Sequence, residues 1–115
     1  MYDKYLSKIK GIKLPQMPSY ATNSYQYYPI IIENEYPMTR NELYEKLKTL
    51  NIYTRKYFYP ACHDYKCYKS NSILNSENLS VVNKLKHKVL CLPFYGNLDK
   101  DVVNKICEVI QNGKK

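Results

Sequence analysis

A helix signal between residues 39 and 51 constrains the fold more than any other part of the sequence, because both of its ends are specified. Thr39 and Glu42 have the spacing of a capping box, in which each side chain accepts a hydrogen bond from the other residue's amide. Asn51 tolerates the left-handed backbone conformation that ends many helices. Three leucines share one face, at Leu43, Leu47 and Leu50. We expect this leucine stripe to be buried, with polar residues mostly away from it: Arg40, Glu45, Lys46 and Lys48.

Residues 12–15 are predicted to be a short strand, and three longer strands are predicted because aromatic, β-branched and other apolar residues dominate residues 25–33, 52–59 and 89–92. Pro29 predicts an edge position or a bulge for the strand at 25–33, since proline donates no hydrogen bond to a neighbour. Alternation in the strand at 52–59 places four side chains on one face: Tyr53, Arg55, Tyr57 and Tyr59. Of the two arginines in the chain, only Arg55 is therefore expected in an aromatic setting.

Further helices are predicted at residues 2–10, 79–86 and 100–112, where apolar residues recur every three or four positions. Gly11 ends the first of them, and Asp99 caps the last. The polar segment 64–78 is predicted to be a loop of variable order. This order indicates an α+β fold, in which helices pack on one face of a small antiparallel or mixed sheet. Residues 1–113 are expected to form a single small domain.

The formal net charge of +8 raises the question of a polyanionic partner, because clustered cations bind phosphates. The lysines are spread from Lys4 to Lys115, which favours a solvated surface. A basic module that binds RNA or another polyanion is therefore the alternative function, and not the one expected. No run reaches the roughly 18 apolar residues of a membrane helix, and the start differs from a signal peptide. We expect a cytoplasmic protein without a membrane segment.

The cysteines and histidines give only a loose metal signature. Four of them have a spacing that approaches zinc ligands: Cys62, Cys67, His87 and Cys91. Cys91 lies in an apolar strand and Cys107 lies on an apolar helix face, so both are predicted to be core residues. No metal site is expected, and the absence of an export signal makes disulfides improbable.

Arg55 and His63 are the residues best suited to bind a polar ligand. The planar donor fork of Arg55 suits phosphate or carboxylate, although stacking between Tyr53 and Tyr57 would also satisfy it without a ligand. His63 follows a Tyr-Pro turn signal and can exchange a hydrogen bond with a ligand. A plain surface histidine is the alternative for His63. The sequence contains no Gly-rich phosphate loop and no Ser-His-Asp order, so no catalytic residue is assigned.

Several motifs follow one another between Gly11 and Ile110: GIKLP, YYPIII, TRNELYEKLKTLNIYTRKYFYPACHDYKCY, VLCLPFYGNL and DVVNKICEVI. In this order they resemble the C-terminal region of the DegT/DnrJ-type sugar-nucleotide aminotransferases. The most specific part is NIYTRKYFYP, followed by Cys-His and then by Tyr-x-Cys-Tyr. The resemblance covers nearly the whole chain.

This resemblance implies a pyridoxal-phosphate (PLP) enzyme of the aspartate-aminotransferase fold. Such an enzyme is a homodimer and moves an amino group from glutamate to a keto sugar on a nucleoside diphosphate, in polysaccharide biosynthesis. By the match, four positions would line the sugar or cofactor cleft: Arg55, Tyr57, Tyr59 and His63.

The resemblance also implies what this sequence does not carry. In the family the Schiff-base lysine, the acid at the pyridine nitrogen and the phosphate-binding loop lie in a large domain, upstream of the matched region. The chain is therefore expected to be an incomplete, truncated part of the enzyme and not to bind PLP covalently by itself. A surface that a large domain would cover is expected to promote self-association.

Overall fold

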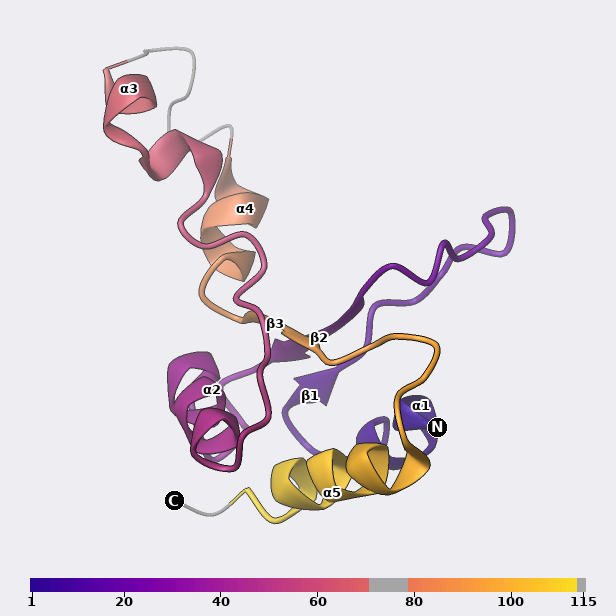
Figure 1. Cartoon of the computed structure of the whole chain (residues 1–115). Helices are drawn as coiled ribbons and strands as arrows, with labels where there is room; N and C mark the ends of the chain where they lie inside the picture. The colour runs from indigo at the N-terminus through magenta and orange to yellow at the C-terminus, as the bar shows by residue number, and fades with distance from the viewer. Residues whose placement is uncertain (71–78, 114–115) are drawn as a thin grey trace.

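The structure is a computed structural model, and it describes residues 1–70 and 79–113. At its centre is an antiparallel sheet in the order β1–β2–β3, made of β1 (Ile12–Lys13), β2 (Tyr28–Ile32) and β3 (Val89–Leu92). Helices α1 (Tyr2–Leu6), α2 (Arg40–Thr49) and α5 (Lys100–Gln111) lie together on one side of this sheet (Figure 1). The predicted α+β class is confirmed, and the sheet is antiparallel throughout its described strands.

The core lies between the sheet and these three helices. Cross-strand pairing puts one set of aliphatic residues on the helical face of the sheet: Ile12, Ile30, Ile32, Leu90 and Leu92. They form one buried cluster with residues from each helix, among them Leu6, Leu43, Leu47, Ile106 and Ile110. Because each fully buried aliphatic side chain contributes about 1.5 to 3 kcal/mol, this cluster is the main source of stability.

Pro29 lies in the central strand β2, so the edge position predicted for it is wrong. Pro29 pairs with Cys91 of β3. The N–H and C=O of Cys91 both form hydrogen bonds with Arg55, which lies on the side of β3 away from β2. Pro29 and Cys91 therefore form a non-hydrogen-bonded pair, in which the nitrogen of Pro29 points toward β1. The pairing of β1 ends with Lys13 opposite Ile31 and does not reach Pro29. Proline thus costs this sheet no ladder hydrogen bond.

Helix α2 begins with the predicted capping box. Thr39 N–H donates to Glu42 Oε2 at 2.7 Å, and Glu42 N–H donates to Thr39 Oγ1 at 3.3 Å. The predicted burial is confirmed for two of its leucines but is wrong for Leu50, which is 40% exposed. Leu50 is the C-cap residue, so its backbone has already left the helical conformation and its side chain leaves the stripe. Arg40 was expected away from the buried stripe and is nevertheless buried itself.

The strand predicted at 52–59 is wrong beyond one residue, because only Arg55 forms a bridge, with Cys91 of β3. Tyr53 would come opposite Pro93, which has no N–H to donate. On the other side, Tyr59 N–H donates to Lys56 O at 3.2 Å, which turns the chain away from the sheet.

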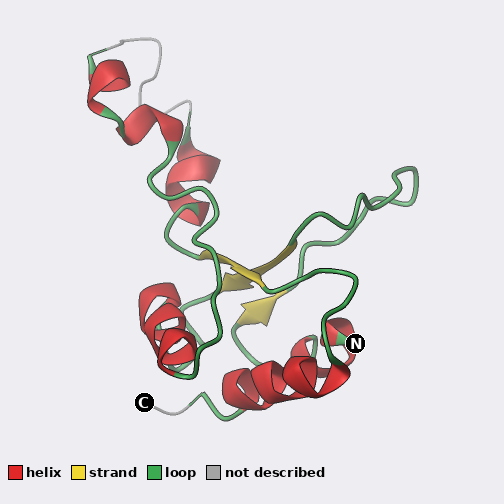
Figure 2. Ribbon diagram, viewed as in Figure 1, coloured by secondary structure: helices red, strands yellow, loops and turns green. Residues whose placement is uncertain are grey.

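An arm projects from the sheet on the side opposite to the three packed helices (Figure 2). We call the following elements the arm: η1 (Cys62–Asp64), α3 (Lys66–Lys69) and α4 (Ser80–Leu85). None of these three elements has a buried residue. The predicted loop at 64–78 is wrong where α3 forms, and its residues 71–78 lie outside the described residues. No helix in the described part of the chain is long and apolar enough to cross a membrane.

Candidate functional site

Two adjoining hollows form an aromatic groove beside β3, and both are lined by Gln26, Tyr27, Phe94 and Tyr95. The smaller hollow measures about 540 Å³ and contains Arg55 and Tyr53 in its wall. Within residues 1–70 and 79–113, the guanidinium of Arg55 makes no hydrogen bond or ion pair. No acidic residue lines this hollow. The smaller hollow therefore has a guanidinium and several aromatic side chains in one wall, which suits an anionic ligand with a flat face.

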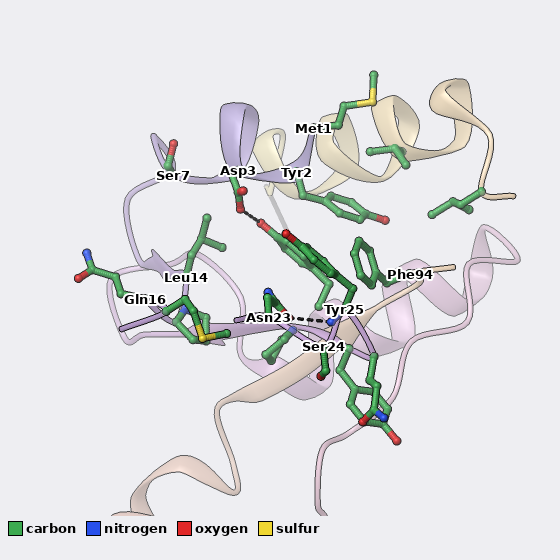
Figure 3. A pocket seen from close by; sticks show the side chains of 18 of the residues that line it. Met1, Tyr2, Asp3, Ser7, Leu14, Gln16, Asn23, Ser24, Tyr25 and Phe94 are labelled. Carbon is green, nitrogen blue, oxygen red and sulfur yellow. Dashed lines mark hydrogen bonds between the residues drawn. The ribbon is translucent and has the colours of Figure 1, made fainter. Parts of the chain in front are cut away.

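The larger hollow, of about 1340 Å³, lies between α1, the segment before β2 and the segment after β3 (Figure 3). Four aromatic rings in its wall contact one another in sequence, with centroid distances of 4.7 Å for Tyr2–Tyr28, 5.7 Å for Tyr28–Phe94 and 6.4 Å for Tyr25–Phe94. Tyr28 donates a hydrogen bond to Asp3, and burial together with this bond raises the pKa of Tyr28. Asp3, the one acid that lines this hollow, is thus already engaged.

Tyr57 is the predicted site residue that lines the larger hollow. Its ring lies 5.2 Å from the ring of Tyr27 and 4.0 Å from that of Phe58. Arg55 and Tyr57 therefore reach the same groove from neighbouring positions, although they line different hollows. The strand alternation that predicted them on one face does not continue past Arg55.

Tyr59 lines neither hollow. Its ring lies 5.0 Å below the guanidinium carbon of Arg40 and 5.4 Å from the ring of His87. The prediction that only Arg55 has an aromatic setting is therefore wrong, because Arg40 packs against Tyr59 and is only 2% exposed. Arg40 also donates from Nη1 to Val89 O at 3.2 Å, and desolvation lowers its pKa. Arg40 thus ties α2 to β3 beneath Tyr59.

His63 lies in the arm, away from the groove. Its Nε2 is 2.8 Å from Asn83 Oδ1, and its side chain is 15% exposed. Next to it, Asp64 forms an ion pair with Lys86 at 2.7 Å. The structure thus brings Arg55 and Tyr57 to one groove and places Tyr59 and His63 elsewhere in this chain. Sequence patterns gave no signal for Arg40 or Asn83, because the contacts of Arg40 with Tyr59 and Val89 and that of Asn83 with His63 join residues far apart in the sequence.

The cysteines divide into two pairs. Cys91 and Cys107 are buried, as predicted, and burial raises the pKa of both thiols. Cys62 and Cys67 are exposed, so they do not contribute to packing. Among the described residues, no group of three or more His, Cys, Asp and Glu side chains could hold a metal ion.

The fold and the sequence both match sugar aminotransferases. The crystal structure of DesI, determined in the presence of its TDP-sugar product, has a TM-score of 0.84 at 23% identity and covers 96% of this chain. A DegT DnrJ EryC1 StrS aminotransferase from Brucella abortus has a TM-score of 0.80 at 26% identity and covers 99% of this chain. The fold is therefore that of one part of an aminotransferase.

The chain belongs to the DegT/DnrJ/EryC1/StrS aminotransferase family, whose model matches residues 1–111. It is 34% identical over 110 residues to the Escherichia coli dTDP-4-amino-4,6-dideoxy-D-glucose transaminase. That alignment covers 96% of this chain but 30% of the relative, and the two crystal structures are matched over 28% and 29% of their chains. The resemblance seen in the motifs is confirmed, and the chain spans less than a third of these relatives.

Enzymes of this family depend on PLP, which forms a Schiff base with a lysine amine. The described residues do not fit that covalent site, because none of their lysines is buried. Of the four half-buried lysines among the described residues, Lys86 and Lys88 are paired with carboxylates, the amine of Lys56 lies 4.3 Å above the ring of Tyr44, and Lys46 lies in the last turn of α2. An amine held by a carboxylate stays protonated and is a poor nucleophile. No step of a PLP reaction is therefore assigned to the described residues.

Proposed function

We propose that this chain is the small C-terminal-type domain, over residues 1–113, of a PLP-dependent enzyme that aminates a nucleotide-linked keto sugar. In this proposal a large domain supplies the cofactor and its lysine, and glutamate is the amino donor. The proposal is carried by the 34% identity to a sugar transaminase over 96% of the chain. The lack of a suitable lysine among the described residues supports the proposal that the PLP site lies in another domain.

The proposed role of this chain is to supply one wall of the sugar-nucleotide cleft. Arg55 and Tyr57 would act from the aromatic groove, where aromatic rings stack on the flat face of a base or sugar and the guanidinium donates hydrogen bonds to a phosphate. Tyr59 and His63 would contact the substrate only where another part of the enzyme lies against this chain and completes the cleft. Arg55 is the strongest of the four candidates, because its guanidinium has no partner within the described residues and no acid competes for it in the hollow.

A chimera tests the proposal directly. The region of the Escherichia coli relative that aligns with this chain is replaced by residues 1–111, and the purified chimera is assayed for transfer of an amino group to dTDP-linked keto sugars. We expect PLP-dependent transamination with glutamate. A chimera that folds and takes up PLP but aminates none of the offered nucleotide sugars would contradict the proposal.

Arg55→Met in the active chimera is expected to lower kcat/KM by about 10- to 100-fold, since a hydrogen bond to a charged group contributes about 1.5 to 3 kcal/mol. Lys56→Met is the matched control, because the neighbouring cation points at the ring of Tyr44 and not into the groove. The steady-state kinetics of both variants provide the measurement. Equal losses of kcat/KM in the two variants would contradict a contact between Arg55 and the substrate.

Exposed aromatic side chains in and beside the groove are proposed as the face that a large domain covers in the enzyme and that a second copy covers in the isolated chain. Tyr53, Phe58 and Tyr95 are 71%, 66% and 64% exposed. Phe58→Ser is expected to weaken self-association of the isolated chain by about 10- to 100-fold, because burial of a phenylalanine contributes about 1.5 to 3 kcal/mol. Sedimentation velocity measures the effect, and Val81→Ser, at an equally exposed position in the arm, is the control. A wild-type chain that stays monomeric at all concentrations contradicts this part of the proposal.

A further inference from the structure

The two ring nitrogens of His63 have different surroundings. Nε2 lies 2.8 Å from Asn83 Oδ1 of α4 and 3.7 Å from Asp64 Oδ1 of η1. Both neighbours are oxygen atoms, so each favours a proton on Nε2. Nδ1 has no hydrogen-bond partner within residues 1–70 and 79–113. The arm therefore binds the imidazole by one nitrogen only.

Asp64 is itself kept as a carboxylate. Lys86 Nζ donates to its two oxygens at 2.7 and 3.0 Å, and Ala61 N–H donates to it at 3.1 Å. The hydrogen bond from Lys86 is the largest cause that lowers the pKa of Asp64. A carboxylate has no proton to donate, so Asp64 can only accept from His63. Asp64 of η1 is a charged group beside His63, and Lys86, the residue that follows α4, is engaged by Asp64.

We propose that Asn83, supported by Asp64, is a positioning residue that fixes His63 in its Nε2–H tautomer and offers Nδ1 to a ligand as a hydrogen-bond acceptor. A neutral imidazole held in this way accepts from a hydroxyl or amino group and cannot donate to a phosphate. The direction of this hydrogen bond is thus a specificity element for a hydroxyl-bearing or amino-bearing ligand. Its use on a sugar rests on the proposed function, whereas the tautomer itself does not.

Nuclear magnetic resonance of the full chain, labelled with ¹⁵N, reads the tautomer. The chain has two histidines, so His87, which is exposed, is an internal reference. At mildly alkaline pH, long-range ¹H–¹⁵N spectra are expected to show His63 with its proton on Nε2 alone and with an observable Nε2 proton. His87 is expected to show mixed tautomers and no observable ring N–H. A proton on Nδ1 of His63, or a mixture equal to that of His87, would overturn the proposal.

Three variants separate positioning from folding. Asn83→Ala is expected to convert His63 to a tautomer mixture, and Asn83→Asp, which keeps an oxygen acceptor, is expected to restore the Nε2–H form. Lys86→Met breaks the ion pair of the arm without touching His63, so the Nε2–H form should persist. A loss of the Nε2–H form in Lys86→Met as large as in Asn83→Ala would mean that the spectrum reports only the folding of the arm, and the proposal fails. Because these spectra need no enzyme activity, failure of the chimera leaves their outcome unaffected.

Discussion

Gly11→Ala is expected to lower the free energy of unfolding by about 3 kcal/mol or more. Gly11 has a φ of +82°, and an added Cβ would lie 2.2 Å from Tyr36 N and 2.7 Å from the carbonyl carbon of Glu35. A left-handed conformation costs a residue with a Cβ about 1 to 2 kcal/mol. Overpacking against atoms that cannot move aside adds about 1 to 3 kcal/mol. Urea unfolding followed by far-ultraviolet circular dichroism measures the loss.

Gly96→Ala is the matched control for Gly11→Ala, since nothing lies within 4 Å of a Cβ added at Gly96. Its free energy of unfolding is expected to stay within about 1 kcal/mol of the wild type, or to rise slightly because the unfolded chain loses conformational freedom. Gly11 also accepts a hydrogen bond from Glu33 N–H at 2.8 Å, which fixes the link between α1 and β1 over the turn at 33–36. If both alanine variants unfold at the same urea concentration, the close packing of Gly11 against Glu35 and Tyr36 is contradicted.

Sequence patterns predicted the features that depend on neighbouring residues. The capping box at Thr39 is present, and Asp99 accepts from Asp101 N–H at 2.8 Å at the start of α5. Strand β3 has the predicted ends, because Pro93 stops it. Asn51 adopts the predicted left-handed conformation, with a φ of 57°. In each case the signal and the structure that it causes lie within a few residues of one another.

The errors fall where contacts between distant residues decide the outcome. Arg40 was expected away from the buried leucine stripe, but its hydrogen bond to Val89 O on β3 and its contact with the ring of Tyr59 bury it. The strand expected at 52–59 needs a partner along its length, and β3 provides one only at Arg55. Helix periodicity continues through Leu50, but the helix ends one residue before it.

The candidate site was predictable in part for the same reason. Arg55 and Tyr57 could be singled out because a basic residue stands among aromatics within one short segment. The groove that surrounds them could not, since Tyr27, Phe94 and Tyr95 come from two other segments and have no common pattern. His63 was a candidate because it follows a Tyr-Pro turn signal and because the family resemblance includes it. The structure adds Asn83 as its partner, and with it the direction of the hydrogen bond that His63 can offer.

Alkaline pH is expected to unfold this chain, because burial raises the pKa of three tyrosines: Tyr2, Tyr28 and Tyr36. For Tyr36, burial raises the pKa from 10.0 to about 12. The folded state therefore prefers the neutral phenol, so this contribution is complete below pH 10 and is lost as the pH rises toward 12. At about 1.4 kcal/mol per pKa unit, Tyr36 alone accounts for roughly 2 to 3 kcal/mol. Denaturant unfolding at a series of pH values measures this decline.

Tyr36→Phe separates the contribution of this phenol from those of the other buried tyrosines. Tyr36 is 5% exposed, and its hydroxyl donates to Ile110 O at 2.7 Å. The variant is expected to lose about 1 kcal/mol at neutral pH, where the hydrogen bond is missing, but to lose less stability than the wild type between pH 10 and 12. Tyr20→Phe, at a position that is 90% exposed, should reproduce the wild-type decline. A decline in Tyr36→Phe as steep as that in Tyr20→Phe would show that the phenol of Tyr36 reaches solvent in the folded chain.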